Sequence, residues 1–289
     1  MHSLTPPVTI KVGCKVNLYL RITGRRADGY HTLESLFLPL SAPYDTLQIR
    51  ENPNETLDFS CSIPALEESR STIHKAYEAY TQASGFRPGL AVHLEKGIPT
   101  GAGLGGGSSD AAALLLYLND LSTQKTGTSL DLKTLTSIAA GIGADVPFFL
   151  YNTPSLISGI GEKVTAVENP FKGMHLLLLC PELHVSTAWA FKAFDEKMEQ
   201  SVKSDLTLST GTDSTSLVHG VLLQNDLEIT VFQKYKELTH FREALLAHGA
   251  ATARMSGSGA SLFGLFATKR AAEEAQRFIQ GLRSYLHEL

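Results

Sequence analysis

Five glycines fall within residues 101–107, between Pro99 and a run of strong helix formers at residues 111–118. Glycine has no Cβ, so the backbone of such a segment can approach a ligand closely and adopt positive φ values. Ser108 and Ser109 follow, and serine is a preferred residue at the start of a helix. The first N–H groups of a helix lack intrahelical acceptors and lie at the positive end of its dipole, which suits an anion. The segment therefore predicts a phosphate-binding loop, rather than a flexible linker.

Three common nucleotide-binding patterns fit this loop poorly. A Walker A loop requires Gly-Lys-Ser/Thr, but Ser108 follows Gly107 with no lysine between them. Residues 101–106 do satisfy G-x-G-x-x-G, and Asp120 lies near the distance expected of a ribose-binding acid. However, residues 97–100 separate the loop from the preceding strand, and no series of βαβ units surrounds it. The protein-kinase signatures His-Arg-Asp and Asp-Phe-Gly are absent. A dinucleotide-binding oxidoreductase stays an alternative, which a thermal-shift comparison of NADH with ATP would decide.

The composition indicates a globular protein that is large enough for two domains. The chain has 289 residues, of which 43% are hydrophobic and 19% charged. The net formal charge is −4, so no basic surface for nucleic acid is expected. Small anions are not excluded by that charge, because backbone amides at a helix N-terminus can bind phosphate.

The cysteines and the apolar runs favour a cytoplasmic location. Cys14, Cys61 and Cys180 are odd in number and widely spaced, which argues against a disulfide framework or a structural zinc site. The first residues lack a basic region followed by an apolar stretch, so no signal peptide is expected. The apolar run at residues 111–118 is far shorter than the roughly 20 residues of a membrane span. We therefore expect a soluble protein without a membrane partner.

Strand and helix patterns are mixed without a regular βαβ rhythm, which predicts an α+β fold. Apolar residues alternate from Val8 to Leu20, and Gly13 is a candidate bulge in that strand. Further strands are expected at residues 32–38, 46–51, 57–61, 90–95, 175–180 and on both sides of 256–259, with a hairpin at 155–167. Helices are expected at residues 71–84, 111–118, 131–140, 187–198, 225–248 and 269–285. Residues 141–150 predict a turn into an apolar strand, and the Ser/Thr-rich residues 201–216 an exposed loop. A change of composition near Asn152 predicts domains at 1–153 and 154–289.

Several segments together resemble the GHMP kinases, the family of galactokinase, homoserine kinase and mevalonate kinase. The sequence PTGAGLGGGSSDAAA at residues 99–113 resembles the phosphate loop of that family. KVNLYL at 15–20, RADGYHTL at 26–33 and GADVPF at 143–148 are similar to one branch of it. MSGSGA at 255–260 resembles the family's C-terminal glycine motif, and Asn225-Asp226 also fits. The resemblance implies an N-terminal domain like ribosomal protein S5 domain 2 and a ferredoxin-like C-terminal domain.

The branch that carries RADGYH phosphorylates the 2-hydroxyl of 4-diphosphocytidyl-2-C-methyl-D-erythritol, in the non-mevalonate route to isoprenoids. The resemblance therefore implies ATP and Mg²⁺ as cofactors and a cytidine-diphosphate substrate. It makes Lys15 and Asp145 the catalytic pair, and Ser108 or Ser109 a possible magnesium ligand. Asn17, Tyr30, His31 and Phe191 are the implied substrate contacts. The implied ATP-binding residues are Pro99, Gly101, Ala102, Gly103, Leu104, Gly105, Gly106, Gly107, Ser108 and Ser109. A sister kinase that acts on another alcohol, such as homoserine, is the alternative, and RADGYH speaks against it.

Each of these side chains also has an ordinary structural interpretation. Lys15 and Asn17 share the polar face of the first strand, which could simply be exposed. Asp145 precedes Val146-Pro147 and could cap a turn. Tyr30 and His31 could be surface aromatics in a polar loop, and Phe191 could be a core residue of its helix. The contacts that these side chains make in the fold distinguish the two interpretations.

Overall fold

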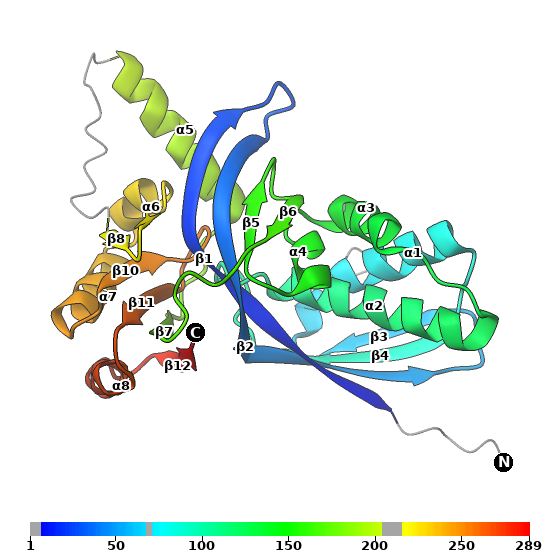
Figure 1. Cartoon of the computed structure of the whole chain (residues 1–289). Coiled ribbons are helices and arrows are strands. Elements are labelled where there is room, and N and C mark those ends of the chain that lie inside the picture. The colour runs from blue at the N-terminus through cyan, green and yellow to red at the C-terminus, as the bar shows by residue number, and fades with distance from the viewer. Residues whose placement is uncertain (1–6, 68–70, 204–215) are drawn as a thin grey trace.

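A long antiparallel hairpin, β1 (Val8–Arg25) with β2 (His31–Glu51), forms the spine of the fold (Figure 1). The computed structural model describes residues 7–67, 71–203 and 216–289. The alternation that predicts β1 is confirmed, and the strand continues beyond Leu20 to Arg25. The pairing register shifts between Val12 and Cys14, which confirms the bulge at Gly13. A Cβ at Gly13 would lie 2.2 Å from the Leu40 carbonyl oxygen, so the two strands meet too closely there for a side chain.

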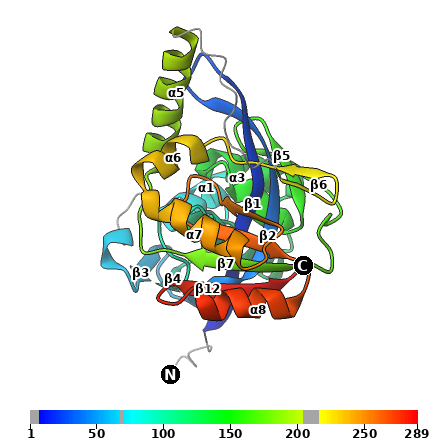
Figure 2. The same ribbon diagram turned by 90° about the vertical axis from the view of Figure 1, so that its left-hand side faces the viewer.

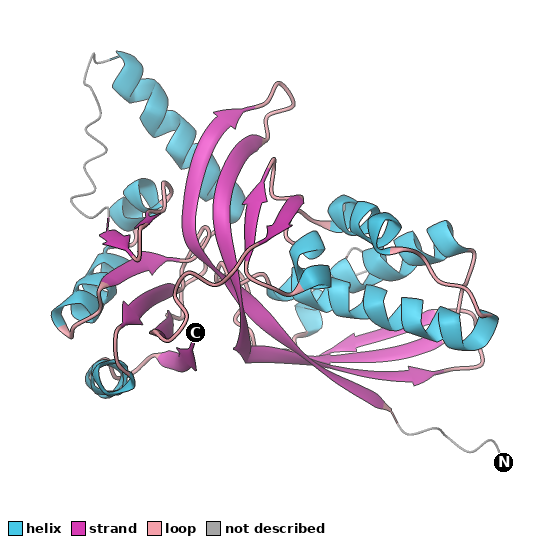
Figure 3. Cartoon of the chain, in the orientation of Figure 1, coloured by secondary structure: helices cyan, strands magenta, loops and turns pink. Residues whose placement is uncertain are grey.

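The hairpin belongs to a six-stranded sheet with the order β3-β4-β2-β5-β6, in which β1 pairs with β2. Its other strands are β3 (Leu57–Cys61), β4 (Leu90–Glu95), β5 (Ser155–Ser158) and β6 (Lys163–Ala166). Helices on one side of this sheet are α1 (Thr72–Ser84), α2 (Gly106–Thr126), α3 (Leu132–Ile142) and α4 (Val146–Tyr151), and a short 3₁₀ turn, Pro64–Leu66, follows β3 (Figure 3). Because β2 is so long, one end pairs with β4 and the other with β5.

A second, four-stranded antiparallel sheet with the order β10-β11-β7-β12 lies against the hairpin. Its strands are β7 (His175–Cys180), β10 (Thr252–Met255), β11 (Leu262–Phe266) and β12 (Arg283–Glu288). The remaining elements are α5 (Thr187–Lys203), β8 (Ser216–Val218), β9 (Val221–Leu223), α6 (Glu228–Lys234), α7 (Lys236–Ala247) and α8 (Lys269–Phe278). Counting only the sheet strands and the helices between them, the chain order is βαββαβ, which is the expected ferredoxin-like pattern (Figure 2).

Three apolar clusters explain why β1 is buried on both faces. One fills the space between the large sheet and α1–α4, and another lies between the second sheet and α5–α8. The third joins the two halves, where Val16 and Leu18 of β1 meet Leu178 and Phe263 of the second sheet. The apolar face of β1 is thus covered by the C-terminal sheet. Lys15 and Asn17 point to the opposite side and are buried as well, so the exposed-strand interpretation of these two residues is wrong.

Three expectations about local structure are wrong. Residues 146–151 form α4 and not a strand, because Pro147 lies in the first helical turn, where its missing N–H costs no hydrogen bond. The helix expected at 225–248 is two helices, with Tyr235 at φ −111° between them. The last helix ends at Phe278, and residues 283–288 instead pair with β7 at the edge of the second sheet.

The domain division at residues 153 and 154 stays a prediction. The hairpin at 155–167 is confirmed as β5–β6, and it pairs with β2 of the large sheet. The loop expected at 201–216 lies largely outside the described residues. Among the residues that the structure describes, no helix is both long and apolar enough to cross a membrane.

Candidate active site

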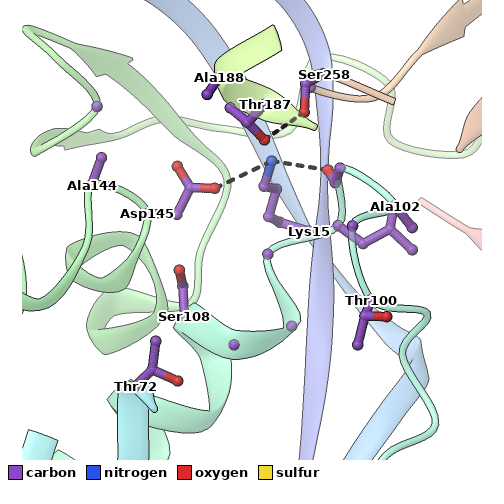
Figure 4. A pocket seen from close by; sticks show the side chains of 18 of the residues that line it. Lys15, Thr72, Thr100, Ala102, Ser108, Ala144, Asp145, Thr187, Ala188 and Ser258 are labelled. Carbon is purple, nitrogen blue, oxygen red and sulfur yellow. Dashed lines mark hydrogen bonds and ion pairs between the residues drawn. The ribbon is translucent and has the colours of Figure 1, made fainter. Parts of the chain in front are cut away.

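One cavity of about 980 Å³ lies where β1, the start of α2, the start of α4, the start of α5 and the turn after β10 converge (Figure 4). The sequence-predicted residues that line it are Lys15, Asn17, Tyr30, His31, Pro99, Gly101, Ala102, Gly103, Leu104, Gly105, Gly106, Gly107, Ser108, Asp145 and Phe191. Ser109 is the exception, because its side chain is fully buried beside the cavity rather than on its wall. The fold thus brings the expected residues together, and their individual roles stay predictions.

The glycine loop is shaped by left-handed backbone and close contacts. Gly101, Gly103 and Gly105 have φ values of 66°, 74° and 73°. A Cβ on Gly103 would lie 2.1 Å from the Ser256 carbonyl oxygen, so the loop and the turn after β10 touch through their backbones. Gly105 is the N-cap of α2, and the N–H groups of Gly106 and Gly107 have no intrahelical acceptor, whereas the Ser108 N–H donates to the Gly105 carbonyl oxygen at 3.0 Å. Such a combination of loop and helix start suits an anion, and its role as a phosphate site stays a prediction.

Lys15 lies beside the loop and faces Asp145. Its ammonium donates to the Gly103 carbonyl oxygen at 3.0 Å and to Asn17 Oδ1, and lies 3.4 Å from Asp145 Oδ2. The Lys15 side chain is only 4% exposed, whereas that of Asp145 is 30% exposed and open to the cavity. Asp145 occupies the N-cap position of α4, yet its side chain makes no capping hydrogen bond. The carboxylate therefore pairs with a lysine instead of capping a turn.

The turn after β10, which belongs to the C-terminal half of the chain, is hydrogen-bonded to the glycine loop. Ser256 Oγ donates to the Gly103 carbonyl oxygen at 3.0 Å and accepts from the Asn17 backbone N–H at 3.1 Å. Asn225 Nδ2 donates to the carbonyl oxygens of Met255 and Gly257, each at 2.8 Å. These contacts give a physical role to the MSGSGA and Asn225-Asp226 signals. Sequence reasoning did not single out Ser256 as a support of the loop.

A buried ionic cluster lies under the start of α2. Lys96 Nζ contacts Asp45 Oδ2 and lies 2.9 Å from Asp110 Oδ2, and all three side chains are at most 4% exposed. Asp45 Oδ1 also accepts from the backbone N–H groups of Gly97 and Ile98, which lead into the glycine loop. Burial raises the pKa of Asp110, against the opposing effect of Lys96. The sequence analysis missed this cluster, since its members come from three separate elements.

The far end of the cavity carries aromatic and charged side chains. The rings of His31 and Phe191 stack with centroids 4.9 Å apart and 25° between their planes. Asp195 Oδ1 lies 2.7 Å from His31 Nε2, and Asp195 Oδ2 lies 3.3 Å from Arg25 Nη1. Tyr30 is 62% exposed at the rim. Phe191 therefore belongs to the cavity wall as well as to its helix.

The two candidate magnesium ligands differ in their surroundings. Ser109 Oγ donates to the Gly106 carbonyl oxygen at 2.8 Å, inside the helix. Ser108 lines the cavity (Figure 4). Within the described part of the chain, no three His, Cys, Asp or Glu side chains gather as a metal-binding group. The role of either serine toward magnesium stays a prediction.

Comparisons with known proteins agree with this geometry. Residues 71–153 match the N-terminal domain of GHMP kinases, and residues 202–282 match the C-terminal domain. The chain is 48% identical over 286 residues to a protein of Nitratidesulfovibrio vulgaris (strain DP4) named 4-diphosphocytidyl-2-C-methyl-D-erythritol kinase, covering 98% of this chain and 99% of that one. A protein of the same name from Lawsonia intracellularis (strain PHE/MN1-00) is 43% identical, with 92% and 90% covered.

Solved structures extend the comparison. A crystal structure of 4-(cytidine 5'-diphospho)-2C-methyl-D-erythritol kinase superposes with a TM-score of 0.72 at 31% identity, covering 96% of this chain and 98% of that one. A homoserine kinase from Cytophaga hutchinsonii ATCC 33406 gives a TM-score of 0.70 at 18% identity, with 99% and 95% covered. At that identity the second likeness shows a shared fold and nothing about the substrate.

Proposed function

The chain belongs to the GHMP kinase family of small-molecule, ATP-dependent kinases, and we propose that it transfers a phosphoryl group from ATP to the 2-hydroxyl of 4-diphosphocytidyl-2-C-methyl-D-erythritol. The observation that carries the proposal is the single cavity that joins the glycine loop, the Lys15–Asp145 pair and His31 with Phe191. Full-length relatives at 48% and 43% identity bear the name of that kinase. The product belongs to isoprenoid precursor synthesis by the non-mevalonate pathway.

The glycine loop is the proposed binding site of the ATP phosphates. The five glycines within residues 101–107 can present only backbone to the cavity, and the first turn of α2 adds N–H groups and the positive end of a helix dipole. Pro99, Ala102 and Leu104 belong to the same wall. Phosphoryl transfer depends on positioning and on charge stabilisation more than on covalent chemistry of the protein. A rigid, closely packed loop meets that need.

Asp145 is the proposed proton acceptor and Lys15 its partner. The substrate hydroxyl gives its proton to the Asp145 carboxylate as its oxygen attacks the terminal phosphorus of ATP, and ADP leaves. Lys15 lies close enough to orient Asp145 and to stabilise the charge that develops on the transferred group. Magnesium, when bound with ATP, would neutralise phosphate charge, and Ser108, which lines the cavity, would be its side-chain contact.

The substrate end of the cavity fits a pyrimidine base. Stacked aromatic rings can cover a flat base, and a histidine can hydrogen-bond its polar edge. Asn17 also lines the cavity, and its amide donates to Ser35 Oγ at 3.0 Å. The three buried free thiols, Cys14, Cys61 and Cys180, support our expectation of a reducing, cytoplasmic setting.

A panel of acceptors in a coupled ADP-release assay tests the proposal. With ATP and Mg²⁺, we expect turnover with the cytidine-diphosphate substrate and none above background with homoserine or mevalonate. A thermal-shift titration should show stabilisation by ATP and none by NADH. Preference for homoserine, or stabilisation by NADH alone, would replace this proposal with one of the two alternatives.

A further inference from the structure

Asp195 lines the end of the cavity at which the base is proposed to bind. It belongs to α5, the helix of Phe191, and the sequence analysis did not single it out. Helix α5 runs beside the end of the hairpin at which the turn joins β1 to β2, in both views of the chain (Figures 1 and 2). One oxygen of Asp195 lies 2.7 Å from His31 Nε2, and the other lies 3.3 Å from Arg25 Nη1. Phe191, one helical turn earlier, stacks on the His31 ring. His31 is therefore fixed both at one ring nitrogen and on one face.

This arrangement decides which nitrogen of His31 carries hydrogen. An ionised carboxylate only accepts hydrogen bonds, so His31 Nε2 must donate to Asp195. In the neutral ring, Nδ1 is then an acceptor. Among the contacts of the described residues, Nδ1 has no hydrogen-bond partner, and His31 lines the cavity.

Cytosine and uracil differ at one edge, so a hydrogen-bond acceptor or donor on the protein can distinguish them there. Cytosine carries an amino group, which donates, at the position where uracil carries a carbonyl oxygen, which accepts. An acceptor at Nδ1 pairs with the amino group of cytosine and faces the uracil oxygen with no hydrogen between them. Rejection of a base by unpaired polar groups is stronger than rejection by shape alone.

We propose that Asp195 is a positioning residue that fixes the His31 tautomer and thereby makes this site select a cytidine over a uridine substrate. The proposal deepens the function stated above and rests on it. Arg25 takes part through the second oxygen of Asp195, since a guanidinium only donates and so keeps that oxygen turned away from His31.

The substitution Asp195→Asn tests this directly because it keeps the shape of the side chain. The amide oxygen should turn to Arg25, which leaves the amide NH₂ facing His31. His31 Nε2 then accepts, and Nδ1 carries the hydrogen. We expect the ratio of kcat/KM for the cytidine-diphosphate substrate to that for its uridine-diphosphate analogue to fall about 10- to 100-fold. The KM for ATP should stay unchanged, and the loss should appear mainly in the KM of the cytidine substrate.

Glu196→Gln is the matched control. It makes the same carboxylate-to-amide change one residue along α5, on a side chain that is 60% exposed and pairs only loosely with Lys192, at 3.8 Å. We expect its base preference and both KM values to equal those of the unchanged protein. Melting temperatures of both variants check that the fold is intact.

Nitrogen-15 NMR of the histidine rings gives a second readout that needs no turnover. The His31 signals, identified by their loss in His31→Gln, should show hydrogen on Nε2 in the unchanged protein and on Nδ1 in Asp195→Asn. Hydrogen on Nδ1 in the unchanged protein, or an unaltered base preference in a folded Asp195→Asn protein, would overturn the proposal. An unchanged protein that turns over neither substrate would refute the proposed function, while the NMR result would still decide the tautomer.

Discussion

Replacing Gly103 by alanine places a methyl group where the glycine loop presses on the turn after β10. The new Cβ would lie 2.1 Å from the Ser256 carbonyl oxygen and 3.1 Å from the Gly259 nitrogen. Both are backbone atoms, so no flexible side chain can move aside. The φ of 74° adds a second cost, because L-residues disfavour the left-handed region.

The two costs can be separated by a variant at the C-terminal end of α2, the helix that follows the loop. Gly127, which caps the other end of α2, has the same φ of 74°, but a Cβ there meets nothing within 4 Å. Gly127→Ala should therefore lose about 1–2 kcal/mol in the free energy of unfolding, from backbone strain alone. Gly103→Ala should carry that strain plus an overpacking cost of about 1–3 kcal/mol.

The overpacking cost can be relieved only by moving the loop, so it should appear in catalysis. If the loop shifts, kcat/KM for ATP should fall roughly 5- to 150-fold, which is the rate equivalent of about 1–3 kcal/mol. Urea unfolding and steady-state kinetics with ATP as the varied substrate measure the two effects. Should Gly103→Ala match Gly127→Ala in both, the close contact at Ser256 would have no consequence and the reasoning would be refuted.

Three further predictions concern single side chains. Asp145→Asn should lower kcat by about 10²–10⁴-fold with ATP binding retained, and adding Lys15→Ala should cost little more, because paired groups are non-additive; multiplied losses in the double variant would contradict a joint role. His31→Ala should raise the KM for the cytidine substrate and leave the KM for ATP unchanged, and an effect on ATP instead would contradict its placement at the base. Burial raises the pKa of Glu228 to about 7, despite the opposing effects of Arg254 and the Met255 N–H, so the folded state holds this proton more tightly than the unfolded chain and loses stability as pH rises from about 5 to 7. The melting temperature of Glu228→Gln minus that of the unchanged protein should therefore increase over this range, and a decrease would contradict the sign.

The sequence predicted those parts of the site that are local in the chain. The glycine loop follows from glycine spacing, and period-two alternation places Lys15 and Asn17 on one face of β1. The start of α2 was predicted too late, because its N-cap is Gly105 and not one of the two serines that follow the glycines. The sequence pattern of residues 269–285 did not show where the last helix ends. They contain a helix and an edge strand, and only the backbone pairing with β7 decides that 283–288 are extended.

Local sequence patterns could not predict contacts between segments that are distant in the chain. Asp45, Lys96 and Asp110 meet because β2, β4 and α2 pack together, and each of them alone looks like an ordinary surface charge in the sequence. The same holds for Asp195, which is 164 residues from His31. Such pairs depend on tertiary packing, which overrides local propensity.

The identity of the product tests the central claim most directly. Phosphorus-31 NMR of the chain incubated with ATP, Mg²⁺ and the cytidine-diphosphate methylerythritol should show one new phosphomonoester signal, growing in step with ADP and coupled to no carbon-bound proton of a primary alcohol. The signal should be nearly absent with Asp145→Asn. Release of ADP without that signal, or a phosphate on a primary hydroxyl, would contradict transfer to the 2-hydroxyl.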